Sequence, residues 1–550
     1  MKWWKEGIIY QIYPRSFFDS SGNGIGDLNG ISKKLNYIKS LGVDMVWICP
    51  FYKSPNKDNG YDISDYKDIS KIFGDLNTFD TLLKKMHSLG LKLIMDLVVN
   101  HTSDKHPWFK KARKSRESKF HDYYIWKDGE KDKKPNNWKS VFSGSAWKWN
   151  EQTKEYFLHL YTKNQPDLNW ENPTVRKEVY SIIDFWLSKG VDGIRMDVIS
   201  LISKRLDFKN IPNNMIFIDV MEKYYANGPR VHEYIKEMNK KVLSKYDIVT
   251  IGEGPGINLN NGLDYVNEDE NELNMIFHFD HLTMDFGKEG KYDPIPFDFI
   301  KFKKIFSNWD KLFSNRGWNS IFLGNHDFSR IVSRFGNDNE FHEESSKLLA
   351  TLLMTLRGTP SLYQGDEIGM TNIDYNNISF YDDVETINAW KEAINKKKNM
   401  KKFFEAIQKQ SRDNARTPMQ WDNKKNAGFS KAKPWIKVND NYKKINVKNQ
   451  EKDLDSILNH YKLLIKLRKE NSTLVYGKYG DLDPMHTKIF SYKRWDENDV
   501  FIIHLNFSDC SVKINSNEIK YYKLVISNYT FAKKSYNLNP WEARIYKLIK

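Results

Sequence analysis

The chain has 550 residues, 40% of them hydrophobic and 29% charged, a balance typical of globular proteins that excludes long disordered regions. Lys and Arg outnumber Asp and Glu by 86 to 71, but the excess lysines are scattered in short runs, which favours solvated helix faces over a nucleic-acid-binding surface. Cys49 and Cys510 have neither a metal-ligand spacing nor the pattern of a disulfide framework. Because there is no apolar signal core and no run of about 18 apolar residues, we expect a cytoplasmic protein without a membrane partner.

In the first two-thirds of the chain, short apolar runs alternate with amphipathic helical stretches. Three helix-to-strand junctions, at residues 40–43, 88–91 and 188–191, share the pattern Ser-x-Gly followed by an apolar residue. Glycine at this position is expected to adopt the left-handed conformation that ends a helix. Two sets of apolar residues at helical spacing each predict one buried helix face: Phe79, Leu82, Leu83, Met86 and Leu89; and Val175, Val179, Ile182 and Trp186.

Eight apolar runs predict strands that begin near residues 8, 43, 91, 191, 248, 275, 319 and 360. Such near-continuous apolar strands are typical of a parallel sheet covered on both faces. Eight βα units can close into a (β/α)₈ TIM barrel, and a doubly wound open sheet is the alternative. We favour the barrel because polar residues follow nearly every run, at the strand ends where barrel enzymes keep their active sites.

Two regions depart from this alternation. Residues 102–172 are rich in Trp, Lys and turn residues and are far longer than one crossover helix requires, which predicts a small inserted domain. After residue 473 the pattern changes to strict alternation, as in Phe501, Ile503 and Leu505 against Ile502 and His504, which predicts an antiparallel β domain. We therefore expect a barrel at 1–101 and 173–472, an inserted domain at 102–172 and a β domain at 473–550.

Acidic side chains stand at the ends of three predicted strands. Asp197, Glu253 and Asp327 should meet at one mouth of the barrel, with Arg195 on the same strand face as Asp197. Glycoside hydrolysis requires this chemistry: one carboxylate attacks the anomeric carbon and one carboxylic acid protonates the leaving oxygen. We expect Arg195 to keep Asp197 ionised and crowding by like charges to raise the pKa of the acid.

Taken together, four segments resemble the signature regions of the α-amylase superfamily, glycoside hydrolase family 13: residues 96–101, 193–198, 251–254 and 322–327. The resemblance extends over essentially the whole chain. It implies an α/β fold, a (β/α)₈ TIM barrel with a small domain inserted after strand 3 and a C-terminal antiparallel β-sandwich. It also implies a small oligosaccharide as substrate, and no sequence pattern indicates an organic cofactor.

The resemblance assigns roles residue by residue. Asp197 is the nucleophile, Glu253 the acid/base, Asp327 the transition-state stabiliser and Arg195 their orienting partner. The ligands of the nonreducing glucose are Asp58, Tyr61, His101 and His326. Residues 165–169 are similar to an additional region of the oligo-1,6-glucosidase group, and residues 411–421 resemble a segment that brings an arginine to the substrate. That arginine is Arg412 or Arg416, and pairing of either with Asp413 is the structural alternative.

Val198 follows the nucleophile, and in similar enzymes valine there accompanies α-1,6 linkages, whereas alanine or threonine accompanies α-1,4 linkages. The resemblance therefore implies a retaining, exo-acting α-glucosidase that cleaves α-1,6 bonds of isomaltose-type oligosaccharides through a glucosyl-enzyme intermediate. Gly254 stands where that group usually has methionine, so a trehalose-6-phosphate hydrolase and an α-1,4- or sucrose-acting α-glucosidase remain alternatives. The alternative outside enzymes is an inactive sugar-binding or scaffold relative, which the three carboxylates disfavour.

Residues 19–27 resemble the calcium loop of the family, in which Asp19, Ser21, Asn23, the carbonyl of Ile25 and Asp27 would ligate one cation. Ser21 and Asn23 stand where the family commonly has Asn and Asp, so the loop loses a negative charge. A calcium site and a cation-free turn are both compatible with the sequence. The sequence does not distinguish a monomer from a homo-oligomer.

Overall fold

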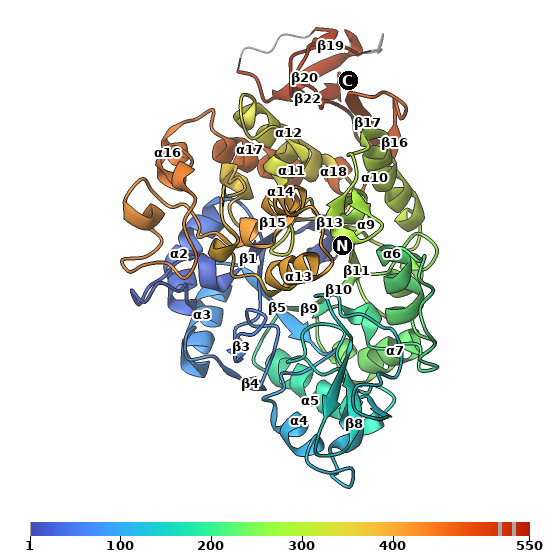
Figure 1. The fold of residues 1–550 in the computed structure, drawn as a ribbon. Helices are drawn as coiled ribbons and strands as arrows, with labels where there is room; N and C mark the ends of the chain where they lie inside the picture. The colour runs from blue at the N-terminus through green and yellow to red at the C-terminus, as the bar shows by residue number, and fades with distance from the viewer. Residues whose placement is uncertain (1, 515–519, 531–534, 550) are drawn as a thin grey trace.

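The computed structural model describes residues 2–514, 520–530 and 535–549. Its centre is a sheet of eight parallel strands in the order β11-β10-β9-β5-β2-β1-β15-β14 (Figure 1). The strands are β1 (Ile9–Ile12), β2 (Met45–Ile48), β5 (Lys92–Val98), β9 (Gly193–Asp197), β10 (Val249–Gly254), β11 (Met275–His278), β14 (Ser320–Ile321) and β15 (Thr359–Tyr363). The Ser320 hydroxyl of β14 donates a hydrogen bond to Ile276 O of β11 at 2.5 Å, which joins the two ends of this order and closes the barrel. The predicted barrel is confirmed, and each strand begins within two residues of its predicted start.

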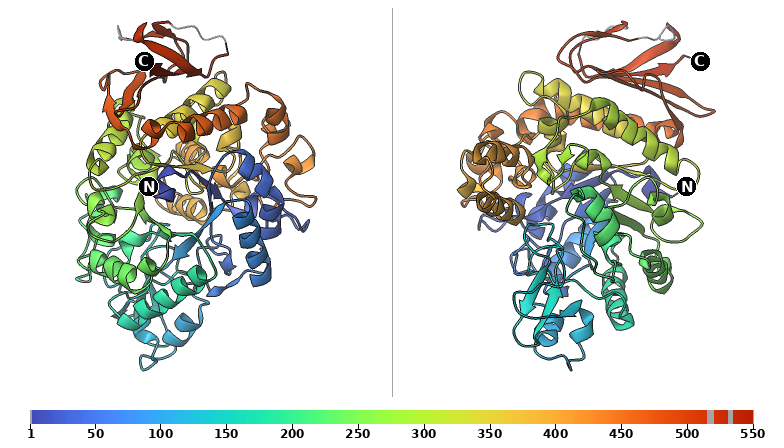
Figure 2. Two further views of the ribbon diagram at one scale, coloured as in Figure 1. Left: turned by 180° about the vertical axis from the view of Figure 1, so that it is seen from behind. Right: turned by 45° about the vertical axis from the view of Figure 1, so that its right-hand side comes forward.

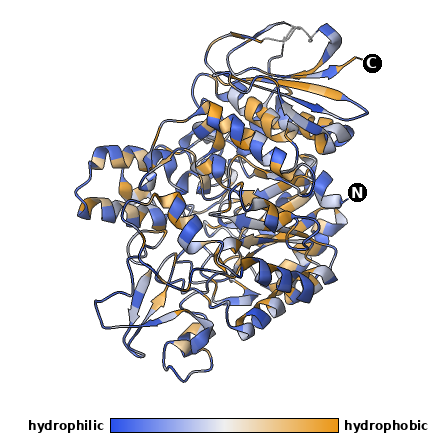
Figure 3. Cartoon of the chain, turned by 90° about the vertical axis from the view of Figure 1, so that its right-hand side faces the viewer, coloured by the Kyte–Doolittle hydropathy of each residue, from blue (hydrophilic) through white to orange (hydrophobic). Residues whose placement is uncertain are grey.

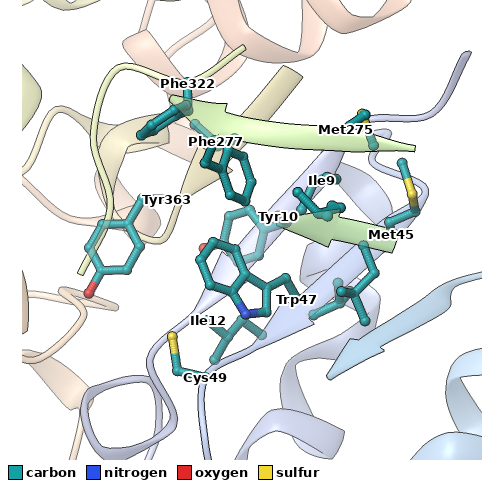
Figure 4. Packing of buried hydrophobic residues seen from close by; sticks show 14 of the residues in the cluster. Ile9, Tyr10, Ile12, Met45, Trp47, Cys49, Met275, Phe277, Phe322 and Tyr363 are labelled. Carbon is teal, nitrogen blue, oxygen red and sulfur yellow. The ribbon is translucent and has the colours of Figure 1, made fainter. Parts of the chain in front are cut away.

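Large side chains fill the interior of the barrel, so that it is a packed core and not a pore. Trp47 of β2 stacks on Phe277 of β11 with ring centroids 5.5 Å apart, and Phe277 meets Phe322 edge to face at 4.9 Å. Figure 4 shows these rings together with Tyr10 and Ile12 of β1, which lie beside Trp47. Aromatic packing at this level leaves the strand ends above it free to carry polar groups.

Helices surround the barrel (Figure 2). The α-helices are α1 (Trp3–Glu6), α2 (Leu28–Ser40), α3 (Leu76–Ser88), α4 (Pro107–Ala112), α5 (Pro173–Ser188), α6 (Phe217–Val220), α7 (Val231–Lys241), α8 (Gly262–Val266), α9 (Asp280–Thr283), α10 (Phe299–Phe313), α11 (Ile331–Phe335), α12 (His342–Thr355), α13 (Val384–Asn395), α14 (Met400–Gln410), α15 (Asp413–Arg416), α16 (Val447–Lys452), α17 (Ile457–Glu470) and α18 (Ser472–Tyr476). Gly42, Gly90 and Gly190 follow α2, α3 and α5 with φ of +91°, +67° and +101°, as the junction pattern predicts. The two predicted apolar helix faces are buried, except that Leu89 lies past the end of α3 and is half-buried.

The inserted region carries its own antiparallel sheet, in the order β6-β8-β7, formed by β6 (Trp126–Asp128), β8 (Glu155–Leu158) and β7 (Trp147–Asn150). The end of the insertion returns to the barrel, because Leu168 N donates to Asn100 O at 2.9 Å and residues 101 and 167 form a β-bridge. In Figure 1 this region and the C-terminal sheet lie at opposite ends of the molecule. The insertion therefore reaches the barrel mouth beside the end of β5. Two shorter hairpins pair β3 (Tyr52–Lys53) with β4 (Asp65–Ile69) and β12 (Phe286–Gly287) with β13 (Gly290–Pro294).

The C-terminal region is an antiparallel sheet of five strands, in the order β16-β17-β18-β22-β20, with a second sheet of β19 and β21. Its strands are β16 (Lys478–Asp481), β17 (Ile489–Trp495), β18 (Val500–Asn506), β19 (Val512–Lys513), β20 (Tyr522–Ser527), β21 (Asn537–Leu538) and β22 (Ala543–Leu548). The predicted boundary at residue 473 falls within α18.

Both faces of the C-terminal sheet are covered. Phe501, Ile503 and Leu505 pack on the main core, whereas Ile502 joins a separate apolar cluster with Leu538. The polar residues of β18, His504 and Asn506, are also buried. The ring of His504 forms a hydrogen bond with the Ser491 hydroxyl at 2.7 Å. Figure 3 shows hydrophobic strands in this sheet and mixed hydrophobic and hydrophilic residues on the helices. In the described part of the chain, no helix combines the length and hydropathy needed to cross a membrane.

Candidate active site

Arg195 is the centre of a buried cluster of charges at the ends of β5, β9 and β10. Its Nη1 donates to Asp96 Oδ1 at 2.7 Å and to Asp197 Oδ1 at 2.8 Å, and its Nη2 lies 2.5 Å from Glu253 Oε1. The parallel register places Asp96 beside Arg195 across the β5–β9 pair. The structure thus brings together Arg195, Asp197 and Glu253, as the sequence predicts, and adds Asp96. The signal for Asp96 in the sequence is an acidic residue in the middle of an otherwise apolar strand.

The pKa values of the two carboxyls follow from this arrangement. Burial raises the pKa of Asp197 well above its usual value, and the negative charge of Glu253 adds to the effect, whereas Arg195 acts to lower it. Burial also raises the pKa of Glu253, against the lowering effect of Arg195. The pKa of Glu253 is therefore raised, as predicted for the acid. Burial of the carboxyl contributes more to this rise than the neighbouring negative charges do. Because one guanidinium serves three carboxyls, its effect on Asp197 alone is weaker than expected.

Val198 adopts a left-handed conformation, with φ +39° and ψ +43°. A β-branched residue rarely adopts this conformation, which costs about 1–3 kcal/mol when the surrounding structure enforces it. Its backbone N–H donates to Glu253 Oε2 at 2.9 Å, and its buried side chain lines the active-site cavity. The residue after Asp197 therefore contacts Glu253 through its backbone and shapes the cavity through its side chain.

A chain of hydrogen bonds orients His326. Gln11 Nε2 donates to His326 Nδ1 at 2.8 Å, so the ring carries its proton on Nε2, which lies 2.7 Å from the Tyr61 hydroxyl. Tyr61 in turn donates to Asp96 Oδ2 at 3.0 Å. Burial lowers the pKa of His326 to about 3, so the ring is neutral near pH 7. Gln11, on β1, has no motif that would have identified it from the sequence.

Ion pairs close one end of the cavity. Arg412 Nη2 donates to Asp58 Oδ1 at 3.1 Å and lies 2.6 Å from Asp383 Oδ1, and its Nη1 reaches Asp327 Oδ1 at 3.3 Å. Arg416 Nη2 donates to Asp327 Oδ1 at 2.8 Å. Arg412 lines the cavity and Arg416 does not, so the structure places Arg412 within reach of a substrate and Arg416 behind Asp327.

Neither arginine pairs with Asp413, whose Oδ2 accepts hydrogen bonds from the backbone N–H groups of Asp382 and Asp383. Burial acts to raise the pKa of Asp327, but the His326 ring and the guanidiniums of Arg412 and Arg416 outweigh it and hold that pKa below its usual range. Asp327 is therefore ionised, whereas burial raises the pKa values of Asp197 and Glu253.

Gln165, in the segment at residues 165–169, connects two predicted glucose ligands. Its Nε2 donates to Asp58 Oδ2 at 3.0 Å and lies 3.2 Å from His101 Nε2. Burial lowers the pKa of His101 to about 4, which leaves a neutral ring beside the cavity. The buried ammonium of Lys204 lies 3.0 Å from Asp167 Oδ2 and so anchors the same segment. The segment at residues 165–169 thus has a structural role in placing Asp58 and His101.

The cavity has a volume of about 190 Å³ and includes the three predicted catalytic carboxyls with Asp58, Tyr61, His101 and Val198 in its wall. Apolar side chains line another part of its wall, among them Val141, Phe217, Met221, Ile257 and Phe328. Lys291 Nζ donates to Glu385 Oε2 at 3.1 Å and to Asp327 O at 3.0 Å.

The side chain of Ile257 fills the space beside Gly254. A Cβ added at Gly254 would lie 2.7 Å from Ile257 Cδ1. A methionine at residue 254 would therefore require Ile257 to move.

The loop at residues 19–27 closes through its own hydrogen bonds. The Asp19 carboxylate accepts five: from the N–H groups of Ser21, Gly22 and Gly24 and from the hydroxyls of Ser21 and Ser430. Asp27 caps α2 through Gly30 N, and Asn23 Oδ1 accepts from Ile25 N. Calcium needs six or more oxygens directed at one point, and in this loop a calcium ion would have to share the oxygens of Asp19, Asn23 and Asp27 with these protein donors.

Comparison with known proteins agrees with this geometry. The family model for the α-amylase catalytic domain matches residues 11–477. The chain belongs to the α-amylase family. It is 51% identical over 555 residues to an oligo-1,6-glucosidase of Parageobacillus thermoglucosidasius, with 99% of each chain covered. It is 47% identical to an oligo-1,6-glucosidase of Bacillus cereus, and that alignment covers 100% of this chain and 99% of the other.

Solved structures of this α-amylase family are also similar. An isomaltulose synthase from Klebsiella sp. LX3 aligns with a TM-score of 0.96 at 41% identity, and one from Protaminobacter rubrum with 0.96 at 42%, each covering 100% of both chains. The predicted family, the predicted fold class and the prediction of a carbohydrate-acting enzyme are thereby confirmed.

Proposed function

We propose that this α-amylase family member is a retaining, exo-acting oligo-1,6-glucosidase, which releases glucose from the nonreducing ends of isomaltose-type oligosaccharides. The observation that carries the proposal is the bridging of Asp197 and Glu253 by one buried arginine, in a cavity that an Asp58–Arg412 ion pair closes at one end. Retention needs a nucleophile and an acid about 5–5.5 Å apart, and two carboxyls bound to one guanidinium are neighbours on that scale.

The first step forms a bond between Asp197 and the anomeric carbon. Glu253 donates its proton to the leaving glycosidic oxygen, and burial, which raises the pKa of this carboxyl, favours its protonated form. Asp327, whose pKa is low, supplies a fixed negative charge for the oxocarbenium-like transition state. In the second step Glu253 takes a proton from water, which attacks the anomeric carbon and releases glucose with its configuration retained.

The closed end supports exo action. Arg412 and Asp58 form a buried ion pair in the cavity wall with His101 and Tyr61, and a chain continuing past the terminal sugar would have to break that pair. These buried polar groups would bind the hydroxyls of one glucose. A substrate lacking them would leave the groups unpaired, which is a strong basis for selectivity.

The α-1,6 preference has two supports. Val198 lines the cavity next to Asp197, and a branched wall there restricts the leaving sugar. The relatives named oligo-1,6-glucosidase are similar over the full chain at up to 51% identity. The named isomaltulose synthases are less similar, at 41–42%, and make sucrose the second candidate substrate.

A phosphorylated disaccharide is less well supported. Among the described residues that line the cavity, the cations are Lys291 and Arg412. Lys291 is paired with Glu385, and Arg412 with Asp58 and Asp383. A phosphate would have to compete with these carboxylates for its partners.

The test is glucose release from isomaltose, maltose, sucrose, trehalose and trehalose-6-phosphate, with Asp197→Asn as the control. We expect isomaltose to give the highest kcat/KM and the control to lose activity. A preference for sucrose would instead indicate a sucrose-acting α-glucosidase. A preference for trehalose-6-phosphate would indicate a trehalose-6-phosphate hydrolase. Failure to turn over any of the five would support an inactive sugar-binding relative.

A further inference from the structure

A second cavity, of about 460 Å³, adjoins the active-site cavity; we call it the distal cavity. It lies between the inserted domain at residues 137–143, the segment 211–225, the β12–β13 hairpin and the helices α13 and α14. The two cavities share part of their walls: Val141, Phe217, Phe286, Lys291 and Glu385 line both. The distal cavity therefore borders the site where a substrate is cleaved.

We propose that the distal cavity binds the reducing-end glucosyl units of isomalto-oligosaccharides of three or more units, so that this enzyme favours chains over isomaltose. The inference rests on the proposed function. With the nonreducing glucose held at the end closed by Arg412 and Asp58, the remaining units must leave past the rim. The shared residues Lys291 and Glu385 border both cavities, so a chain that leaves past them reaches the distal cavity.

The size and lining of the distal cavity suit uncharged sugars. Its volume lies within the range of roughly 300–1,000 Å³ that is usual for ligand sites. The lining includes the aromatic residues Phe217, Tyr292 and Phe403, which can contact sugar C–H groups, and Asn137 and Asn213, which can pair with hydroxyls. Such a mixture of ring faces and neutral polar groups is expected where sugars bind.

The charges in the distal cavity are interleaved. Lys396 lies 2.7 Å from Glu392, Lys398 lies 2.5 Å from Glu289, and Lys291 is paired with Glu385. An anionic ligand would have to displace these carboxylates, whereas sugar hydroxyls can accept from the lysines and donate to the glutamates together. The pairing therefore favours a neutral polyol over a phosphate.

The test compares kcat/KM for isomaltotetraose with kcat/KM for isomaltose. Ala389, half-buried on α13, lines the distal cavity but not the active-site cavity, so Ala389→Phe fills the distal cavity. Exposed Lys391 on the same helix is not part of the cavity lining, so Lys391→Phe is its matched control. A second pair comes from the loop, with Asn213→Trp at the cavity and Asn214→Trp, the adjacent exposed residue, as control.

We expect the unmodified enzyme to favour isomaltotetraose by on the order of tenfold, and both filling variants to bring the ratio close to one while both controls retain it. A ratio near one in the unmodified enzyme, or a ratio that both filling variants retain, overturns the proposal. The use of a ratio keeps a general loss of activity from counting as support. Absence of isomaltose turnover would instead contradict the proposed function itself.

Discussion

The backbone N–H of Val198 donates a hydrogen bond to Glu253 Oε2 at 2.9 Å, so the residue that follows the nucleophile also holds the acid/base. The left-handed conformation of Val198 is what turns its N–H toward Glu253 and its side chain toward the cavity. One residue therefore connects linkage preference with the position of the catalytic proton.

Replacement of Val198 by alanine should widen the wall beside the scissile bond. We expect kcat/KM for isomaltose relative to maltose to fall by roughly 10-fold, since one or two methyl groups in a pocket discriminate at about that level. The measurement is kcat/KM for both disaccharides. Hydrolysis of p-nitrophenyl α-glucoside, whose leaving group depends little on the acid, should change less. An unchanged ratio would show that Val198 only packs at the strand end.

Gln11→Glu should change the pH dependence of activity. Burial keeps the pKa of His326 at about 3, and a carboxylate placed 2.8 Å from Nδ1 would favour the protonated ring and raise that pKa. Activity that depends on neutral His326 would then be lost as pH falls through the raised pKa, so the acid limb of kcat/KM should move to higher pH. Gln11→Leu removes the donor without adding a charge and should lower kcat without moving the limb. Identical profiles for both variants would contradict the role given to Gln11.

Arg412 and Arg416 should be separable by kinetics and stability. Arg412→Ala removes a group at the cavity, and we expect kcat/KM for isomaltose to fall on the order of 100-fold with a clear rise in KM. Arg416→Ala removes the closer of the two guanidiniums paired with Asp327, and we expect a loss of about 3 kcal/mol in the free energy of unfolding. Steady-state kinetics and denaturant unfolding measure the two effects. Equal effects of both substitutions on KM would place both arginines at the substrate.

The loop at residues 19–27 should not depend on calcium. Its carboxylates accept hydrogen bonds from protein donors, so removal of divalent cations with EDTA should leave the thermal midpoint unchanged. Ser430→Ala, which removes the hydroxyl donor to Asp19, should instead destabilise the protein by about 1–3 kcal/mol. A midpoint that falls with EDTA and recovers with calcium would restore the family's cation site.

The sequence predicted the barrel and its charged centre because both follow from local patterns. Strands appear as apolar runs, and Asp197 and Glu253 each stand where such a run ends. The groups that orient them come from distant parts of the chain. Gln11 meets His326 across 315 residues, and no local pattern encodes that contact.

The same limit applies to the choice between the two arginines. Arg412 and Arg416 are one helical turn apart around α15, so periodicity does not separate them. Their partners Asp58, Asp327 and Asp383 belong to three other segments, and only tertiary structure shows which arginine faces the cavity. The calcium loop was ambiguous for a related reason, since Ser430 lies 411 residues from Asp19.

The most direct test of the mechanism is to identify the residue that becomes glucosylated. The Glu253→Gln variant, given α-glucosyl fluoride, can form the intermediate, because fluoride leaves without a proton, but lacks the base that activates water. Digestion and mass spectrometry should then find one glucosyl unit on the peptide that contains Asp197, and none in Asp197→Asn. A glucosyl unit on any other residue, or turnover of the fluoride with inversion of configuration, would contradict the proposed double displacement.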